Sequence, residues 1–334
     1  MKWYFFILGF VGTQTLNGQD TSGHNKFIHF TPTTFSNSFK LNISPVLSIH
    51  SDDTVSTETI DAAGFDKHNI KRQKGGNPLT GPFYIEDSKP GDVLAITLTR
   101  ISLNRSSAIT TGTLVSRALP KSTLEQFPKK LPLIKWNLDQ ENSTATLDSS
   151  FEHLQNFKIP LHPFLGCIGV APDGEKSDVL SFFLGTYGGN LDFSAVAQGA
   201  TVYLPVFHDG ANLFIGDGHA VQGDGEIAGN ALETSLDVEF TVHLIKNDSL
   251  KLTNPIIEDS NYMMSAGSAK SLDDAIKVAT SGLFNWLRAS YHLSLVETSL
   301  VLSTSIEYTI AEIADPEVEV VAKIKKKFLS GLKK

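Results

Sequence analysis

The stretch GDGHAVQGDGEIAG, residues 216–229, places an imidazole and several carboxylates on a glycine-rich backbone. Two copies of Gly-Asp-Gly, at 216–218 and 223–225, flank His219, and Glu226 follows the second copy. Asp-Gly pairs are typical of tight turns, so both copies are predicted to be turns. Imidazole and carboxylate groups bind divalent cations and also transfer protons. The stretch is therefore a candidate metal or proton-transfer site, and a plain pair of turns is the alternative.

Two further clusters contain the same kinds of residue. ETIDAAGFDKHN, residues 58–69, includes Asp61 at the end of an expected strand, and GTYGGNLDF, residues 185–193, includes Asn190 and Asp192. In a metal hydrolase, three protein ligands hold the ion and leave one position for water, whose pKa the ion lowers. Each cluster taken alone is also explained by turns at strand ends.

Several other chemistries are excluded by motif. The chain has no G-x-S-x-G, no Walker A, no dinucleotide fingerprint, no H-E-x-x-H and no paired Cys-x-x-Cys. Its single cysteine, Cys167, lies between apolar neighbours, which favours a core residue over a nucleophile. The formal net charge of −8 argues against a nucleic-acid partner, which normally requires a basic face.

The N-terminus has the pattern of a secretory signal peptide. Lys2 precedes an apolar run over residues 3–11, and small and polar residues follow. The run is too short to span a bilayer, and the alternative is a buried N-terminal strand. We therefore expect residues 1–19 to be removed and the protein to be secreted or periplasmic, without membrane association afterwards.

Residues 20–334 are predicted to form one mainly β domain of the α+β class, an antiparallel sandwich or barrel-like body. Twenty-six glycines and many short alternating runs support this. Residues 208–212 are a predicted hairpin turn between strands 202–207 and 213–215. One half-buried strand is indicated by alternating apolar residues, which are Leu232, Leu236, Val238, Phe240, Val242 and Leu244.

The C-terminal part changes to a helical period, which predicts a helical hairpin over residues 271–304. Ser271 with Asp274 suits an N-terminal cap, and a second helix is expected to start at Ser294. The expected inward stripe of the first helix consists of Ile276, Ala279, Leu283, Trp286 and Leu287. A final strand is expected within residues 318–328. Residues 104–160 are the least patterned and are interpreted as an irregular insertion or subdomain.

Four segments, in this order, together resemble the acetamidase/formamidase family. They are GGNPLTGPFYIEDSKPGDVLAITLTRI (75–101), HPFLGCIGVAP (162–172), TYGGNLDF (186–193) and GDGHAVQGDGEIAGNALET (216–234). The helical hairpin and ADPEVEV (314–320) also resemble the C-terminal end of that family. The resemblance covers roughly residues 25–325, with the poorest fit across 104–160.

The resemblance implies hydrolysis of the C–N bond of short amides by a β-rich protein that forms homodimers and uses a divalent metal, zinc or calcium. Its implied metal ligands are Asp61, His219 and one carboxylate from Asp192 or Glu226. Its implied proton carrier is Glu226 or Glu233, with His219 also catalytic, and its implied substrate-binding residues are Gly189, Asn190 and Gln222. Glu226 has the same parity as Leu232 and Leu236, so it points inward if the strand runs back unbroken.

The sequence thus predicts an exported, metal-dependent hydrolase of short linear amides such as formamide and acetamide, with a metal-activated water as nucleophile. Its expected partner is a small amide substrate. The alternative is a secreted, non-catalytic binding module that keeps a structural calcium ion in the same scaffold, because acidic, glycine-rich loops also suit calcium.

Overall fold

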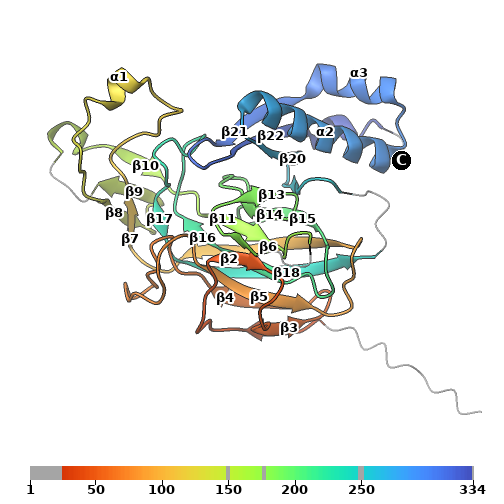
Figure 1. Cartoon of the computed structure of the whole chain (residues 1–334), viewed down its shortest axis with the longest axis horizontal. Coiled ribbons are helices and arrows are strands. Elements are labelled where there is room, and N and C mark those ends of the chain that lie inside the picture. The colour runs from red at the N-terminus through yellow and green to blue at the C-terminus, as the bar shows by residue number, and fades with distance from the viewer. Residues whose placement is uncertain (1–24, 148–150, 175–177, 247–251, 333–334) are drawn as a thin grey trace, which may run out of the picture.

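Two large sheets form the body of the protein, and a pair of helices lies over one end (Figure 1). The computed structural model describes residues 25–147, 151–174, 178–246 and 252–332. The predicted signal peptide, residues 1–19, lies outside these ranges. Within them, no helix combines the length and apolar character needed to cross a membrane.

The first sheet has nine strands, and only its pairing of β1 with β4 is parallel. In spatial order the strands are β1 (Phe27–His29), β4 (Thr54–Glu58), β18 (Leu236–Ile245), β6 (Val93–Leu103), β15 (Thr201–Pro205), β19 (Ile256–Glu258), β20 (Tyr262–Ala269), β22 (Val318–Lys325) and β21 (Glu307–Glu312).

The second sheet has eleven strands and supplies most of the candidate site. Its main order is β10 (Lys158–Pro160), β9 (Thr144–Leu147), β8 (Ile134–Asp139), β7 (Ser107–Thr110), β17 (Glu233–Thr234), β16 (Leu213–His219), β11 (Phe164–Gly169), β14 (Gly188–Asn190) and β13 (Leu184–Gly185). β5 (Leu79–Ile85) pairs with β16, and β3 (Leu47–Ile49) runs parallel to β5.

The remaining elements are short, apart from two helices. β2 (Ser38–Lys40) pairs with β12 (Asp178–Leu180). The helices are α1 (Lys121–Leu124), the 3-10 turn η1 (Glu152–Leu154), α2 (Leu272–Tyr291), α3 (Leu295–Ser305) and α4 (Lys326–Leu329). The prediction of a mainly β protein with antiparallel sheets and a C-terminal helical hairpin is confirmed.

The two sheets share one hydrophobic core. Phe83 of β5 and Phe240 of β18 belong to different sheets, and their ring centroids are 5.2 Å apart. On β18, Leu236, Val238 and Phe240 are fully buried, while the residues between them are more accessible. The predicted alternation is confirmed from Leu236 to Val242, and it gives this strand its inward face. It does not extend back to Leu232, because Glu233 and Thr234 form β17 of the second sheet and both Glu233 and Ser235 are buried.

Helix α2 covers β20 and β22, and small residues set its inward face. Ala275 and Gly282 are buried, whereas Ile276, which was expected in the stripe, is 39% exposed. A Cβ on Gly267 of β20 would lie 2.2 Å from the backbone nitrogen of Ala279, so the helix lies too close to the sheet for larger residues. This close approach rotates the stripe away from the position that apolar periodicity indicates.

The helix starts are confirmed in detail. The Ser271 side chain accepts a hydrogen bond from the backbone N–H of Asp274. At the start of α3, Ser294 and Glu297 form a reciprocal capping box.

The predicted hairpin across residues 208–212 is wrong. β15 pairs with β6 and β19 in the first sheet, whereas β16 pairs with β11, β5 and β17 in the second. The turn therefore carries the chain from one sheet to the other. Two buried apolar strands around a tight turn can form a hairpin within one sheet or can belong to two different sheets. Local sequence does not decide between these, because it does not specify the partner strand.

Residues 104–160 contain more regular structure than their sequence indicates. β7, β8, β9 and β10 form an antiparallel series that extends the second sheet beyond β17, next to the short helix α1 (Figure 1). These strands have only three to six residues, which is too short for a clear periodic pattern.

Candidate active site

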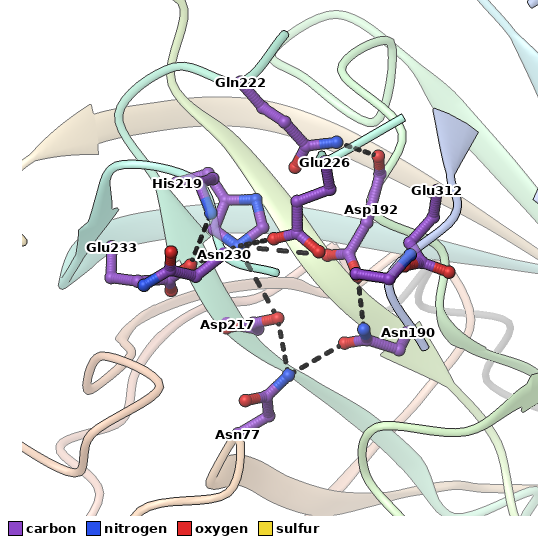
Figure 2. A network of polar contacts seen from close by, with 12 residues as sticks. Asn77, Asn190, Asp192, Asp217, His219, Gln222, Glu226, Asn230, Glu233 and Glu312 are labelled. Carbon is purple, nitrogen blue, oxygen red and sulfur yellow. Dashed lines mark hydrogen bonds and ion pairs between the residues drawn. The ribbon is translucent and has the colours of Figure 1, made fainter. Parts of the chain in front are cut away.

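His219, the last residue of β16, is the centre of a buried cluster of carboxylates (Figure 2). Its ring is completely buried and meets the ring of Phe164 edge-on at 4.9 Å. Four carboxylate oxygens surround its Nε2 atom, at 3.4 Å from Glu233, 3.6 Å from Asp217, 3.8 Å from Asp192 and 4.0 Å from Glu226.

Segments distant in sequence deliver these side chains. Glu233 lies on β17 directly opposite His219, while Asp217 precedes His219 on β16. The first Gly-Asp-Gly copy is thus part of a strand, which corrects the expected turn. A Cβ on Gly218 would lie 2.7 Å from the carbonyl oxygen of Thr234, so glycine is needed for β16 and β17 to pair.

Three of the carboxylates are carried by residues with left-handed backbone. Asp192, Asp217 and Glu226 have φ angles of 41°, 56° and 45°. This region is uncommon for residues other than glycine, and such conformations concentrate at functional sites. The unusual backbone is how the chain turns side chains from two loops and a strand toward one imidazole.

The negative charge of the cluster and its buried polar atoms without partners fit a divalent cation. Five polar atoms of the cluster are buried without a hydrogen-bond partner among the residues that the structure describes. They are Oδ1 of Asp192, Oδ1 of Asp217, Oε2 of Glu233 and both ring nitrogens of His219. Buried polar atoms normally have partners, so these atoms call for a ligand. Candidate ligand atoms of Asp192, His219 and Glu226 lie within 4.8 Å of one another, as do those of Asp217, His219 and Glu233.

The pKa shifts express the same excess of negative charge. Burial raises the pKa of Asp192 well above its usual range, and the carboxylates of Glu226 and Asp217 raise it further. Burial also raises the pKa of Glu226 and of Glu233, against the opposing effect of His219. Burial lowers the pKa of His219, but Glu233 and Asp217 outweigh it, so the net pKa lies well above the usual value. A bound cation would compensate the negative charge of these carboxylates.

Asn190 holds the cluster in place from the side opposite His219. Its Nδ2 donates to Asp192 and, at 3.0 Å, to Asp315. Its Oδ1 accepts from Nδ2 of Asn77 at 3.0 Å and from the thiol of Cys167 at 2.8 Å. Because both ends of the amide are engaged, Asn190 positions Asp192 in this arrangement. Its contact with substrate stays a prediction.

Gly166 of β11 is a site residue that the sequence analysis did not identify. A Cβ there would lie 2.6 Å from Oδ1 of Asp192, 2.7 Å from Oδ2 of Asp217 and 2.9 Å from Cε1 of His219. Asn77 was also missed, although its Nδ2 donates to Oδ2 of Asp217 at 2.9 Å. Neither residue carries a local signal, because each meets the cluster through pairing of distant segments.

Asp61, a predicted metal ligand, is used elsewhere. Its Oδ2 accepts from Nη2 of Arg105 at 2.6 Å, and its Oδ1 accepts from the backbone N–H of Phe65 at 2.8 Å. Arg105 also donates to the backbone carbonyl of Glu233 at 3.2 Å. With both oxygens occupied, Asp61 is a partner of a buried arginine, and it supports β17 rather than joining the groups around His219.

The other two predicted substrate-binding residues differ in position. A Cβ on Gly189 would lie 2.3 Å from the carbonyl oxygen of Phe183, so this glycine permits strand pairing and presents nothing to the cluster. Gln222 donates to the backbone carbonyls of Asp192 and Ala311, at 2.5 and 3.2 Å. Its Oε1 has no partner among the described residues. Of the predicted substrate contacts, Gln222 thus offers a free acceptor at the site.

The fold is similar to that of solved acetamidases. The structure of an acetamidase from Bacillus halodurans is similar, with a TM-score of 0.76 and 26% identity over 91% of this chain and 99% of that one. An acetamidase from Yersinia enterocolitica gives a TM-score of 0.77 and 28% identity over 92% and 94% of the two chains.

Sequence comparison also places the chain among the acetamidases and formamidases. Residues 23–180 and 185–282 match the Acetamidase/Formamidase family, so the chain belongs to this amide-hydrolase family. A formamidase from Methylophilus methylotrophus is 36% identical over 101 residues, which are 27% of this chain. The matched stretch spans only 24% of that formamidase.

Proposed function

We propose that this protein is an exported, metal-dependent hydrolase of linear primary amides, which it converts to a carboxylate and ammonia. The observation that carries the proposal is the buried imidazole surrounded by four carboxylates, with orphan ligand atoms, in a member of an amidase family. An imidazole in the donor set favours zinc or another borderline cation over calcium, which prefers oxygen ligands.

Asp217, His219 and Glu233 would hold the cation, because they form the group with the shorter contacts to His219. A divalent cation held there would polarise an amide carbonyl and lower the pKa of water. Oε1 of Glu233 already accepts a hydrogen bond from the backbone N–H of Ala231 at 2.9 Å, which fixes this carboxylate in a ligand position.

Glu226 is then the proton carrier. It is the most accessible of the four carboxylates, and it borders a cavity beside the cluster. It takes a proton from water as the water oxygen bonds to the amide carbon, and it returns the proton to nitrogen as the C–N bond breaks and ammonia leaves. Its raised pKa, caused first by burial, lets the carboxyl group hold a proton between these two steps.

The test is ammonia release from formamide, acetamide and propionamide. The protein is assayed as purified, after chelation, and after addition of zinc or calcium. His219→Ala is expected to abolish both activity and metal retention, whereas His243→Ala, on the exposed part of β18, is the matched control and keeps both. Undiminished ammonia release after chelation and in His219→Ala would refute the proposal.

Export and the homodimer remain predictions from the sequence. N-terminal sequencing of protein recovered outside the cytoplasm tests removal of residues 1–19, with cleavage expected near Gly18 or Gln19. Sedimentation equilibrium tests the homodimer.

A further inference from the structure

An apolar cavity of about 180 Å³ adjoins the cluster on the side of Glu226. Its apolar walls include Trp136, Ile159, Ile227 and Leu232. His219 and the other three carboxylates do not line it, whereas Glu226 does. The cavity therefore lies beside Glu226, whose carboxylate points toward His219 and joins the cavity to the cluster (Figure 2).

Two separate parts of the chain build this cavity. Trp136 of β8 and Ile159 of β10 come from the extension formed by residues 104–160. Most of the opposite wall comes from residues 221–232, the loop that carries Glu226. The extension, for which the sequence suggested no role, thus supplies a wall next to the reactive centre.

The volume exceeds what a formyl or acetyl group fills. An apolar protein cavity of roughly 150 Å³ is large enough to bind benzene. A small acyl group would leave most of the walls without contacts, and unfilled apolar space forfeits dispersion attraction. A ring or a branched chain of benzene size fits the volume and the apolar character of the lining.

Two polar atoms of the lining residues lack partners. Within the described part of the chain, the indole Nε1–H of Trp136 is a buried donor without an acceptor, and Oε1 of Gln222 is a buried acceptor without a donor. A primary amide offers one carbonyl acceptor and two N–H donors. Because both atoms are themselves buried, the match between such an amide and the cavity depends on the size and the apolar lining of the cavity.

We propose that the preferred substrates are primary amides whose acyl group is a benzene-sized ring or branched chain, and that Trp136 and Ile159 determine this preference. The inference depends on the proposed amidase function for turnover, but not for binding. Each methylene placed in such a pocket is worth roughly 10-fold in kcat/KM. Benzamide and isobutyramide are therefore expected to exceed formamide by at least about 100-fold.

The experiment combines turnover with binding. Gly223 lines the cavity, its φ is not in the left-handed region, and a Cβ there meets nothing within 4 Å. Gly223→Leu is therefore designed to fill the cavity, and Ile159→Trp fills it from the opposite wall. Gly331→Leu is the matched control, because it adds the same side chain at a glycine outside the cavity lining where a Cβ also meets nothing within 4 Å. Benzamide binding is measured by calorimetry, and ammonia release from formamide, acetamide, isobutyramide and benzamide is measured in parallel.

The expected result is at least about 10-fold weaker benzamide binding and turnover in Gly223→Leu and in Ile159→Trp, with a smaller loss of acetamide turnover. Gly331→Leu should match the unsubstituted protein. The inference is overturned if formamide or acetamide is preferred, or if benzamide binding is the same in all variants. If benzamide binds in a cavity-dependent way but no amide releases ammonia, the amidase proposal fails, while the assignment of the cavity stands.

Discussion

Gly166→Ala should disable the site while leaving the fold intact. The φ of Gly166 is outside the left-handed region, so alanine is acceptable to the backbone of β11. Its backbone carbonyl accepts hydrogen bonds from the N–H groups of Leu191 and Asp192, at 2.8 and 3.2 Å, and the substitution keeps them. The effect of the methyl group is therefore steric and confined to the cluster.

The magnitude follows from the contacts. The new Cβ would lie 2.6 Å from Oδ1 of Asp192, about 0.9 Å inside the roughly 3.5 Å at which favourable contacts begin. The Asp192 and Asp217 carboxylates must both move, and a displacement near 1 Å costs about 100-fold in rate. Overpacking of this kind destabilises a fold by about 1–3 kcal/mol, which a domain of ordinary stability survives.

The assay compares kcat/KM for ammonia release, bound metal and the thermal midpoint in Gly166→Ala and in Gly112→Ala. Gly112 is the matched control, because a Cβ there meets its nearest atoms at an ordinary 3.6 Å. We expect the loss of activity and metal in Gly166→Ala alone. Wild-type activity and metal content in a folded Gly166→Ala protein would refute the proposed geometry of the site.

Three further substitutions test other features. Asp61→Asn should cost about 3–5 kcal/mol of stability, because it leaves Arg105 buried without its partner, yet metal content should persist; loss of metal from folded protein would return Asp61 to the ligands. Burial, and then Asp315, raise the pKa of Glu312 from 4.5 to about 8, so ionisation of Glu312 opposes folding and stability falls as pH rises across this window. Glu312→Gln should flatten that dependence in thermal unfolding, and an unchanged pH profile would contradict the assignment. Cys167→Ser should keep ammonia release within a few-fold, since a hydroxyl can also donate to Asn190; complete loss would indicate a chemical role for the thiol.

The sequence predicted the elements whose pattern is local. Alternation revealed β18, and capping residues located the starts of both C-terminal helices, because each signal lies within a few residues of what it specifies. His219 and its neighbouring carboxylates were predicted from glycine-rich spacing together with the family resemblance. Their residue types restrict the chemistry even before the partners are known.

The remaining parts depend on contacts between distant segments. Asn77 and Asp217 are 140 positions apart, and Asn190 and Asp315 are 125 positions apart. No periodicity or motif within one segment specifies such pairs. Asp61 shows the converse ambiguity, since a carboxylate at a strand end is equally suited to a metal or an arginine. Only the fold decides which of the two it meets.

The left-handed backbone of three carboxylate residues indicates that the fold itself forms the site. Conformations of this kind cost about 1–3 kcal/mol each and persist only where surrounding contacts enforce them. Asp192 is held by Asn190 and by the carbonyl of Gly166, and Asp217 is held by Asn77. The backbone of Glu226 is held at both ends, by the carbonyl of Gly223 and the N–H of Gly229. Because these contacts involve only protein groups, the mutual repulsion of the carboxylates is imposed by folding, and a cation entering the cluster would relieve repulsion that is already present.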